Sequence, residues 1–261
     1  METKLEKLTW PEVEEIVNKP HAVIVPVGSV EQHGRHLPLN VDYECPKYIA
    51  EKAAIRIAEQ HDVRVLVAPA IHYGETSTGF QDFPGVIGLT IDTAIRMFED
   101  IARSFVNSGF KKIVFLNGHY SNSGPLGIAL RKVYVTNRDV NLYGVNWFAL
   151  GGDVFNRIKK SEFGLHADEM ETSASMVIQP ENVRFEEAVK EIPAYSLSEK
   201  WTKPATHGKV FFHTLKQYPI KAKGSAGVMG DPTVASKETG EKLLEACVEG
   251  LVQLIVEIAD T

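Results

Sequence analysis

Carboxylates and imidazoles lie close together in the segment SVEQHGRHLPLNVD, which begins at Ser29. Glu31 and His33 are separated by one residue, so their side chains point to the same side of an extended segment. A carboxylate and an imidazole placed in this way are suitable ligands for a divalent metal ion. Asp42 follows a loop that contains Pro38 and can return to the same point, where its two oxygens could bridge two ions. The simpler alternative is a loop of solvated polar residues.

Another histidine follows a separate apolar run, in the segment LNGHYSNSG. An Asn-Gly pair is a common turn, which explains Asn117 and Gly118 without any chemistry. That explanation leaves His119 without a reason, and we predict it as a further metal ligand.

The segment LHADEMETS contains a third group of ionisable residues, whose acidic members are Asp168, Glu169 and Glu171. Acidic side chains in a first helical turn suit the helix dipole, so part of this group has a structural explanation. His166 has no such explanation. Because histidine changes its charge near neutral pH, we predict His166 as an acid–base catalyst.

These segments must be positioned by strands and helices that alternate along the chain. Apolar runs with β-branched residues predict buried strands at 22–28, 63–71, 111–118 and 140–148. Helical spacing predicts helices at 48–60, 91–109, 125–135, 171–178 and 234–259. This alternation predicts an α/β fold, a three-layer αβα sandwich with a mainly parallel sheet. Because ligands bind beyond the carboxyl ends of such strands, the three segments should converge on one site.

Composition limits the class of protein. The 261 residues suit one large domain, and we predict a single domain over 1–261. A net charge of −6 argues against a nucleic-acid partner, which needs a basic surface. The two cysteines, Cys45 and Cys247, form no disulfide framework. No secretory leader or membrane span is apparent, so we expect a cytoplasmic protein with no membrane partner.

Two further observations concern loops. No glycine-rich phosphate-binding motif follows a predicted strand, which argues against a nucleotide-binding protein. The segment 184–230 has no clear periodicity, and we interpret it as a long excursion that forms a lid or an oligomer contact.

The segment VPVGSVEQHGRHLPLNVD resembles the metal-binding stretch of the creatininase family. LNGHYSNSG resembles the N-G-H motif of that family, and LHADEMETS resembles the motif that begins with its catalytic histidine. DFPGVIGLT and GVMGDPTVASKETGEKLL resemble two further family segments, so the resemblance runs from about Leu8 to the last helix.

The resemblance implies an αβα fold that holds two divalent metal ions (zinc, manganese or iron) and assembles as a homohexamer. Carried over by position, Glu31 and His119 hold one ion, His33 holds the other, and Asp42 bridges them. The resemblance also implies that a metal-activated water attacks a carbonyl group, and that His166 moves a proton to the leaving group.

Other residues are predicted to bind a small-molecule substrate. Tyr120 and Trp147 match family positions near the substrate. Arg35 lies in a loop expected near the pocket. Asp168 stands where the family usually has glycine, so it adds a charge there.

One family ligand is missing from this chain. Creatininase proper has a glutamate ligand where this chain has Ser121, which is a poor ligand. Either the second ion is held more weakly, or another carboxylate takes over. Glu171 is the first candidate, as a ligand and as a catalytic residue, and Glu169 is the second. The Trp and acidic residues that come before the catalytic histidine of creatininase proper are also absent before His166, which argues against creatinine as the substrate.

We therefore predict a metal-dependent hydrolase in which an activated water attacks the carbonyl of a small cyclic amide or formamide. An alternative within the same resemblance is a hydrolase of a cyclic diketone from inositol catabolism, like the 3-dehydro-scyllo-inosose hydrolases. An alternative of another class is a metal-binding structural subunit without activity, which the change at Ser121 motivates.

Overall fold

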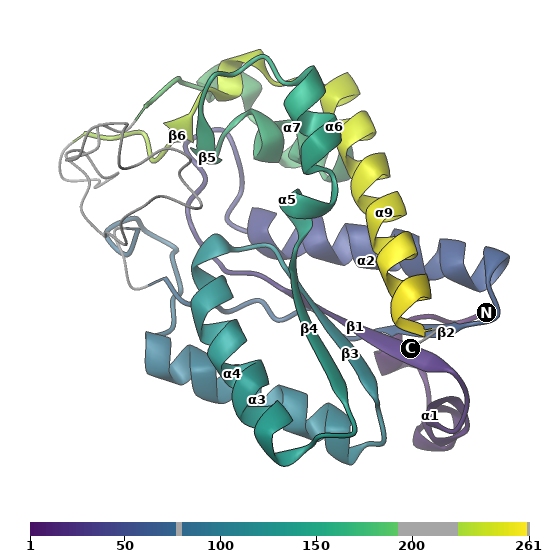
Figure 1. Ribbon diagram of the computed structural model, residues 1–261. Coiled ribbons are helices and arrows are strands. Elements are labelled where there is room, and N and C mark those ends of the chain that lie inside the picture. The colour runs from purple at the N-terminus through teal and green to yellow at the C-terminus, as the bar shows by residue number, and fades with distance from the viewer. Residues whose placement is uncertain (77–79, 193–223, 260–261) are drawn as a thin grey trace.

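Four parallel strands form the central sheet of the computed structural model, which describes residues 1–76, 80–192 and 224–259 (Figure 1). The strands are β1 (His21–Val27), β2 (Arg64–Val67), β3 (Lys112–Asn117) and β4 (Asn141–Asn146), in the order β2-β1-β3-β4. Each neighbouring pair is parallel. A separate antiparallel pair joins β5 (Gly164–His166) to β6 (Met229–Gly230).

Helices cover both faces of the sheet (Figure 1). On one face lie α2 (Val41–Gln60) and α9 (Lys237–Ala259), and α7 (Glu169–Ile178) packs against both. On the other face lie α1 (Trp10–Val17), α3 (Ile91–Asn107) and α4 (Ser123–Thr136). The short helices α5 (Trp147–Leu150) and α6 (Gly152–Ile158) pack against α9. Single 3-10 turns occur at Leu5–Lys7, Tyr120–Asn122, Pro180–Asn182, Phe185–Glu187 and Pro232–Val234.

The two sides of β1 belong to two different hydrophobic cores. Ala22 and Ile24 pack with α2 and α9, whereas Val23 and Val25 pack with α3 and α4. Successive side chains of a strand point to opposite faces, so a strand covered on both faces needs a continuous apolar run. The predicted α/β fold, with a mainly parallel sheet between helices, is confirmed.

Two element boundaries differ from the prediction in ways that affect the site. Helix α2 begins at Val41 rather than at residue 48, so Asp42 lies in its first turn and not in a loop. The early polar residues and Pro46 conceal this start from a search for apolar periodicity. The fourth strand ends at Asn146, so Trp147 and Phe148 belong to α5 rather than to the strand.

The predicted excursion at 184–230 lies partly outside the described residues, which omit 193–223. Its described ends meet, because Glu191 and Gly230 exchange two backbone hydrogen bonds of 3.0 and 2.8 Å. Among the helices that the structure describes, none combines the length and apolar character needed to cross a bilayer.

Candidate metal centre

The ionisable residues predicted from three separate segments meet where β1 and β3 end. Glu31 and His33 follow β1, Asp42 lies in the first turn of α2, and His119 follows β3. Glu171 belongs to the first turn of α7, which follows β5. The carboxyl ends of parallel strands are where such folds place their ligands.

Two glycines allow α2 to approach the strand ends this closely. A Cβ atom at Gly118 would lie 1.8 Å from the backbone oxygen of Asp42, and one at Gly28 would lie 2.4 Å from the backbone nitrogen of Tyr43. Neither separation is physically possible for a real side chain. Gly28 and Gly118 therefore let the backbone of the first turn of α2 rest directly on β1 and β3, which brings Asp42 to the site.

Glu31, Asp42 and His119 form a first group of ligand atoms, all within 4.8 Å of one another. Nδ1 of His119 lies 3.1 Å from Oδ2 of Asp42 and 3.5 Å from Oε1 of Glu31. All three side chains are buried. The other ring nitrogen of His119, Nε2, lies 2.7 Å from the carbonyl oxygen of Glu75. A carbonyl only accepts, so Nε2 carries the hydrogen and Nδ1 is left to face the carboxylates.

His33, Asp42 and Glu171 form a second group of the same kind. Nε2 of His33 lies 3.2 Å from Oδ1 of Asp42 and 3.7 Å from Oε2 of Glu171. Nδ1 of His33 donates to the carbonyl oxygen of Glu31 at 3.1 Å. Asp42 thus offers one oxygen to each group, which is the arrangement of a carboxylate that bridges two ions.

The electrostatics of the two groups favour cations. Burial raises the pKa of Glu31 to about 7 and that of Glu171 to about 8. Burial alone would lower the pKa values of His33 and His119, but the neighbouring carboxylates raise both to about 10. Oε2 of Glu31 is buried and accepts no hydrogen bond from the described residues. Buried carboxylates need compensating positive charge, and two divalent ions would supply it, so these residues fit a pair of metal ions.

His166 borders both groups. Nε2 of its ring lies 2.7 Å from the carbonyl oxygen of Gln32 and 3.0 Å from the side-chain nitrogen of the same residue, and its Nδ1 lies 3.5 Å from Oε1 of Glu31. The ring stacks on Phe80, with centroids 4.4 Å apart, and burial lowers its pKa well below the usual value. A neutral imidazole with an available Nδ1 can accept a proton at the centre. His166 also forms a third potential ligand group with Glu31 and His33, so the geometry permits a ligand role as well.

The other acidic residues near His166 have structural contacts. Both carboxylate oxygens of Glu169 accept backbone N–H groups, from Lys160 at 3.0 and 2.9 Å and from Ser161 at 2.7 Å. Oδ1 of Asp168 caps α7 by accepting the N–H groups of Met170 and Glu171, at 2.9 and 3.1 Å. Among the described residues, neither carboxylate belongs to a group that could hold a metal ion. The structure thus brings Glu171, and not Glu169, to the centre.

The residues predicted to bind substrate are placed unevenly. Tyr120 is 49% exposed and follows His119 directly, but Trp147 is 1% exposed and packs in the core beside α9. The aromatic ring near Tyr120 is that of Phe148, at a centroid separation of 6.4 Å. Arg35 is exposed. The strand β4 ends at Asn146 and α5 begins at Trp147. At this turn the side chain of Trp147 packs into the core, and that of Phe148 lies near Tyr120 instead.

Sequence reasoning missed Phe80, Phe148 and the carbonyl of Glu75. Phe148 could have been found from its position next to Trp147 at a strand end. Phe80 and the Glu75 carbonyl carry no signal in residue type or spacing, because one acts by stacking and the other through the backbone.

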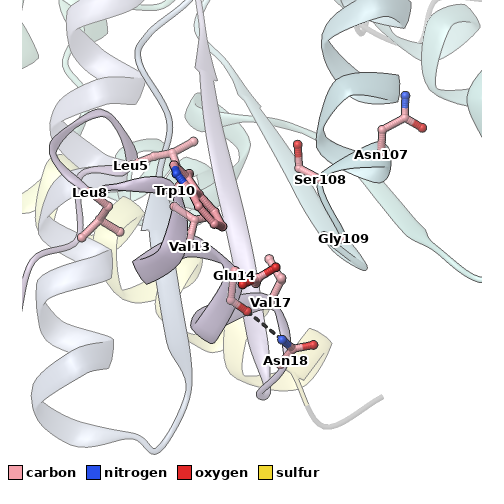
Figure 2. Close-up of a pocket in the computed structure, with 10 residues that line it drawn as sticks. All are labelled: Leu5, Leu8, Trp10, Val13, Glu14, Val17, Asn18, Asn107, Ser108 and Gly109. Atoms are coloured by element: carbon pink, nitrogen blue, oxygen red, sulfur yellow. Dashed lines mark hydrogen bonds between the residues drawn. The ribbon is translucent and has the colours of Figure 1, made fainter.

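A surface cavity of about 620 Å³ lies elsewhere, between α1 and the end of α3 (Figure 2). Its lining mixes apolar residues such as Leu5, Trp10 and Val13 with polar ones such as Glu14 and Asn107. It contains none of the candidate ligand residues above, so this cavity lies away from the candidate metal centre.

Comparison with known proteins finds relatives that match nearly the whole chain. The model of the creatininase family, described as creatinine amidohydrolase, matches residues 6–255. The chain is 30% identical to a creatinine amidohydrolase of Pseudomonas putida, with 96% of this chain and 95% of that protein covered. It is 28% identical to a 3-dehydro-scyllo-inosose hydrolase of Thermotoga maritima, with 97% and 82% covered. A mycofactocin precursor peptide peptidase of Mycobacterium tuberculosis is also 28% identical, with 90% and 84% covered.

Solved structures give the same result for the fold. A crystal structure of creatininase superimposes with a TM-score of 0.81 at 27% identity, over 98% of this chain and 97% of the other. A manganese form of creatininase gives a TM-score of 0.81 at 27% identity, with 98% of each chain covered. The matched segment, the shared fold and the relatives at these identities show that the chain belongs to the creatininase family.

Proposed function

We propose that this protein is a metal-dependent hydrolase that cleaves a small amide, cyclic amide or formamide at a centre of two divalent ions. The observation that carries the proposal is the pair of buried ligand groups that share Asp42. The names of two relatives, a creatinine amidohydrolase and a peptidase, describe hydrolysis of amide bonds, which supports this substrate class. Solved creatininases in manganese and zinc–zinc forms support Zn²⁺ or Mn²⁺ as the ions, with Fe²⁺ as a further candidate.

Bound divalent ions at this centre would supply Lewis acidity and a water of lowered pKa. The residues of the chain would bind the ions, transfer a proton and contact the substrate. Glu31, Asp42 and His119 would hold one ion, and His33, Asp42 and Glu171 would hold the other. His166 accepts a proton from the attacking water at Nδ1 and passes it to the leaving nitrogen, while Phe80 covers its ring. Tyr120 contributes an aromatic surface for the substrate at the exposed side.

Glu171 compensates for Ser121 in this account. It is partly exposed, it lies 3.7 Å from Nε2 of His33, and its Oε2 accepts the N–H of Ala167 at 2.6 Å. Ala167 has a φ of 50°, a conformation that residues with a side chain adopt at a cost. The strained peptide therefore helps to orient the carboxylate that replaces the family glutamate.

A second candidate function is hydrolysis of a cyclic diketone. The 3-dehydro-scyllo-inosose hydrolase matches 97% of this chain, and attack of an activated water on a ketone needs the same centre. A substrate screen decides between the two functions. Metal-free protein is reloaded with Zn²⁺, Mn²⁺ or Fe²⁺ and assayed with creatinine, formamides and cyclic diketones. Metal-dependent turnover of an amide supports the first function, and turnover of the diketone alone supports the second. Two bound ions without turnover would instead support a structural subunit.

The variant Asp42→Ala tests the shared ligand. It should lose both ions and all activity, since Asp42 is one of the three ligands in each group and also connects the two groups. Glu44→Ala is the matched control, because Glu44 lies in the same turn of α2 and pairs with Lys47 instead. Metal content is measured for both variants after dialysis. Near-wild-type turnover in Asp42→Ala would refute the two-ion model.

We further propose that the chain forms one domain over 1–261 and works in the cytoplasm as a homohexamer. The hexamer is proposed from the family resemblance. Sedimentation at several protein concentrations tests the assembly, with a hexamer as the expected species and a monomer at all concentrations as the contrary result.

A further inference from the structure

The side chain of Asn122 lies at the junction of three loops beside the proposed metal centre. It belongs to the 3-10 turn Tyr120–Asn122 that follows His119, and it is fully buried. Its Oδ1 accepts the N–H of Glu75 at 2.8 Å. Its Nδ2 donates to the carbonyl oxygen of Gly28 at 3.0 Å and to Oδ1 of Asn117 at 3.3 Å. The carboxamide therefore joins the loops that follow β1, β2 and β3.

These partners fix the orientation of the carboxamide. One neighbour is a donor and the other two are oxygens, so a flipped amide would face each of them with the wrong group. The space is also filled, because a Cβ atom at Gly74 would lie 2.5 Å from Oδ1 of Asn122. Loss of the carboxamide would remove these buried hydrogen bonds to Glu75, Gly28 and Asn117, which is costly.

Glu75 connects Asn122 to the metal centre. Asn122 holds the N–H of Glu75, and the carbonyl of the same residue accepts Nε2–H of His119 at 2.7 Å. The backbone of His119 is held separately: its N–H donates to Oδ1 of Asn117 at 3.2 Å, and its carbonyl accepts from Nδ2 of Asn117 at 2.7 Å. Asn117 thus holds the backbone of His119, and the carbonyl of Glu75 holds its imidazole ring.

We propose that Asn122 is a positioning residue that acts through the Glu75 carbonyl to keep the hydrogen of His119 on Nε2, and so presents Nδ1 to the ion of the Glu31–Asp42–His119 group. The contacts of Asn122 reach this group and not the group of His33 and Glu171. Its loss should therefore weaken one ion selectively. This inference rests on the proposed metal centre.

The test uses three changes at Asn122 and one control. Asn122→Ala removes the acceptor for Glu75, and Asn122→Leu does so while filling the space. Asn122→Asp keeps that acceptor but loses both donors. Asn146→Ala is the matched control, because Oδ1 of Asn146 accepts from Asn117 and Ser123 in the same network, at 2.9 and 3.1 Å, whereas the N–H of Glu75 donates to Asn122.

Two measurements are made on full-length protein. Metal-free protein is titrated with Zn²⁺ in competition with a chromophoric chelator. Zinc-loaded protein labelled with ¹⁵N-histidine reports which ring nitrogen of His119 carries the hydrogen. For Asn122→Ala or Asn122→Leu we expect one of two dissociation constants to rise by about 10- to 100-fold, as for loss of other groups that orient a ligand. We also expect His119 to lose its uniform Nε2–H form.

Asn122→Asp and Asn146→Ala should keep both ions and the Nε2–H form, although both should melt at a lower temperature than the wild type. A purely structural role would instead make metal affinity follow thermal stability in all four variants, and that result would overturn the inference. Wild-type affinity and an unchanged tautomer in Asn122→Ala or Asn122→Leu would also overturn it while leaving the metal centre intact. A wild-type protein that binds no Zn²⁺ would overturn both.

Discussion

At the scale of single residues, the two histidines proposed as metal ligands are held in the same way. His33 donates from Nδ1 to the carbonyl of Glu31, and His119 donates from Nε2 to the carbonyl of Glu75. In each case the backbone fixes the hydrogen on one nitrogen and directs the other at Asp42. The residue types were visible in the sequence, but these backbone partners were not, because a carbonyl is present at every position.

His166 differs from those two histidines in its charge preference. The neighbouring carboxylates raise the pKa values of His33 and His119, whereas burial lowers that of His166. A neutral His166 suits a proton acceptor.

We predict that His166→Ala keeps both ions but lowers kcat by about 10²- to 10⁴-fold, the usual contribution of a general acid or base. Metal content and turnover are measured on the same preparation. Loss of an ion together with activity would instead assign His166 to the ligand group that it forms with Glu31 and His33.

At the scale of elements, the close packing of the first turn of α2 on β3 decides where Asp42 lies. We predict that Gly118→Ala lowers the melting temperature and the metal content together, since its Cβ would meet the Asp42 carbonyl at 1.8 Å. Gly124→Ala in α4 is the control, because nothing lies within 4 Å of its Cβ, and it should stabilise the protein by about 0.4–1 kcal/mol. Full metal content in Gly118→Ala would show that this contact does not position Asp42.

The sequence predicts the elements of the fold better than their ends. Buried strands are continuous apolar runs, so β1 and β3 could be located from composition alone. Helix α2 has the acidic residues Asp42 and Glu44 in its first turn and Pro46 in the turn after it, and its start is stabilised by contact with β1 and β3 rather than by its own periodicity. Likewise, Trp147 follows an apolar run, and only the turn after Asn146 determines that it packs inward while Phe148 lies near Tyr120.

At the scale of the whole molecule, stability should depend on pH through a histidine remote from the metal centre. Nδ1 of His21 donates to the carbonyl of Lys19 at 2.7 Å, and its Nε2 accepts the N–H of Lys111 at 3.3 Å. Burial lowers the pKa of His21, so the folded protein prefers the neutral ring. The stabilisation is complete above the ordinary pKa of about 6.5 and is lost as pH falls through the lowered pKa of the folded state.

The variant His21→Gln checks this prediction. The free energy of unfolding is measured by denaturant titration at about pH 8 and pH 5, on either side of the ordinary histidine pKa. The wild type should lose more stability between the two conditions than His21→Gln does. Equal losses in both proteins would exclude His21 as a source of the pH dependence.

The central claim is that one chain holds two divalent ions through a shared Asp42. The most direct measurement is a calorimetric titration of metal-free wild-type protein with Zn²⁺, alongside Asp42→Ala. We predict two ions bound per wild-type chain and neither retained by Asp42→Ala. Fewer than one ion per folded wild-type chain, or unchanged binding in Asp42→Ala, would contradict it.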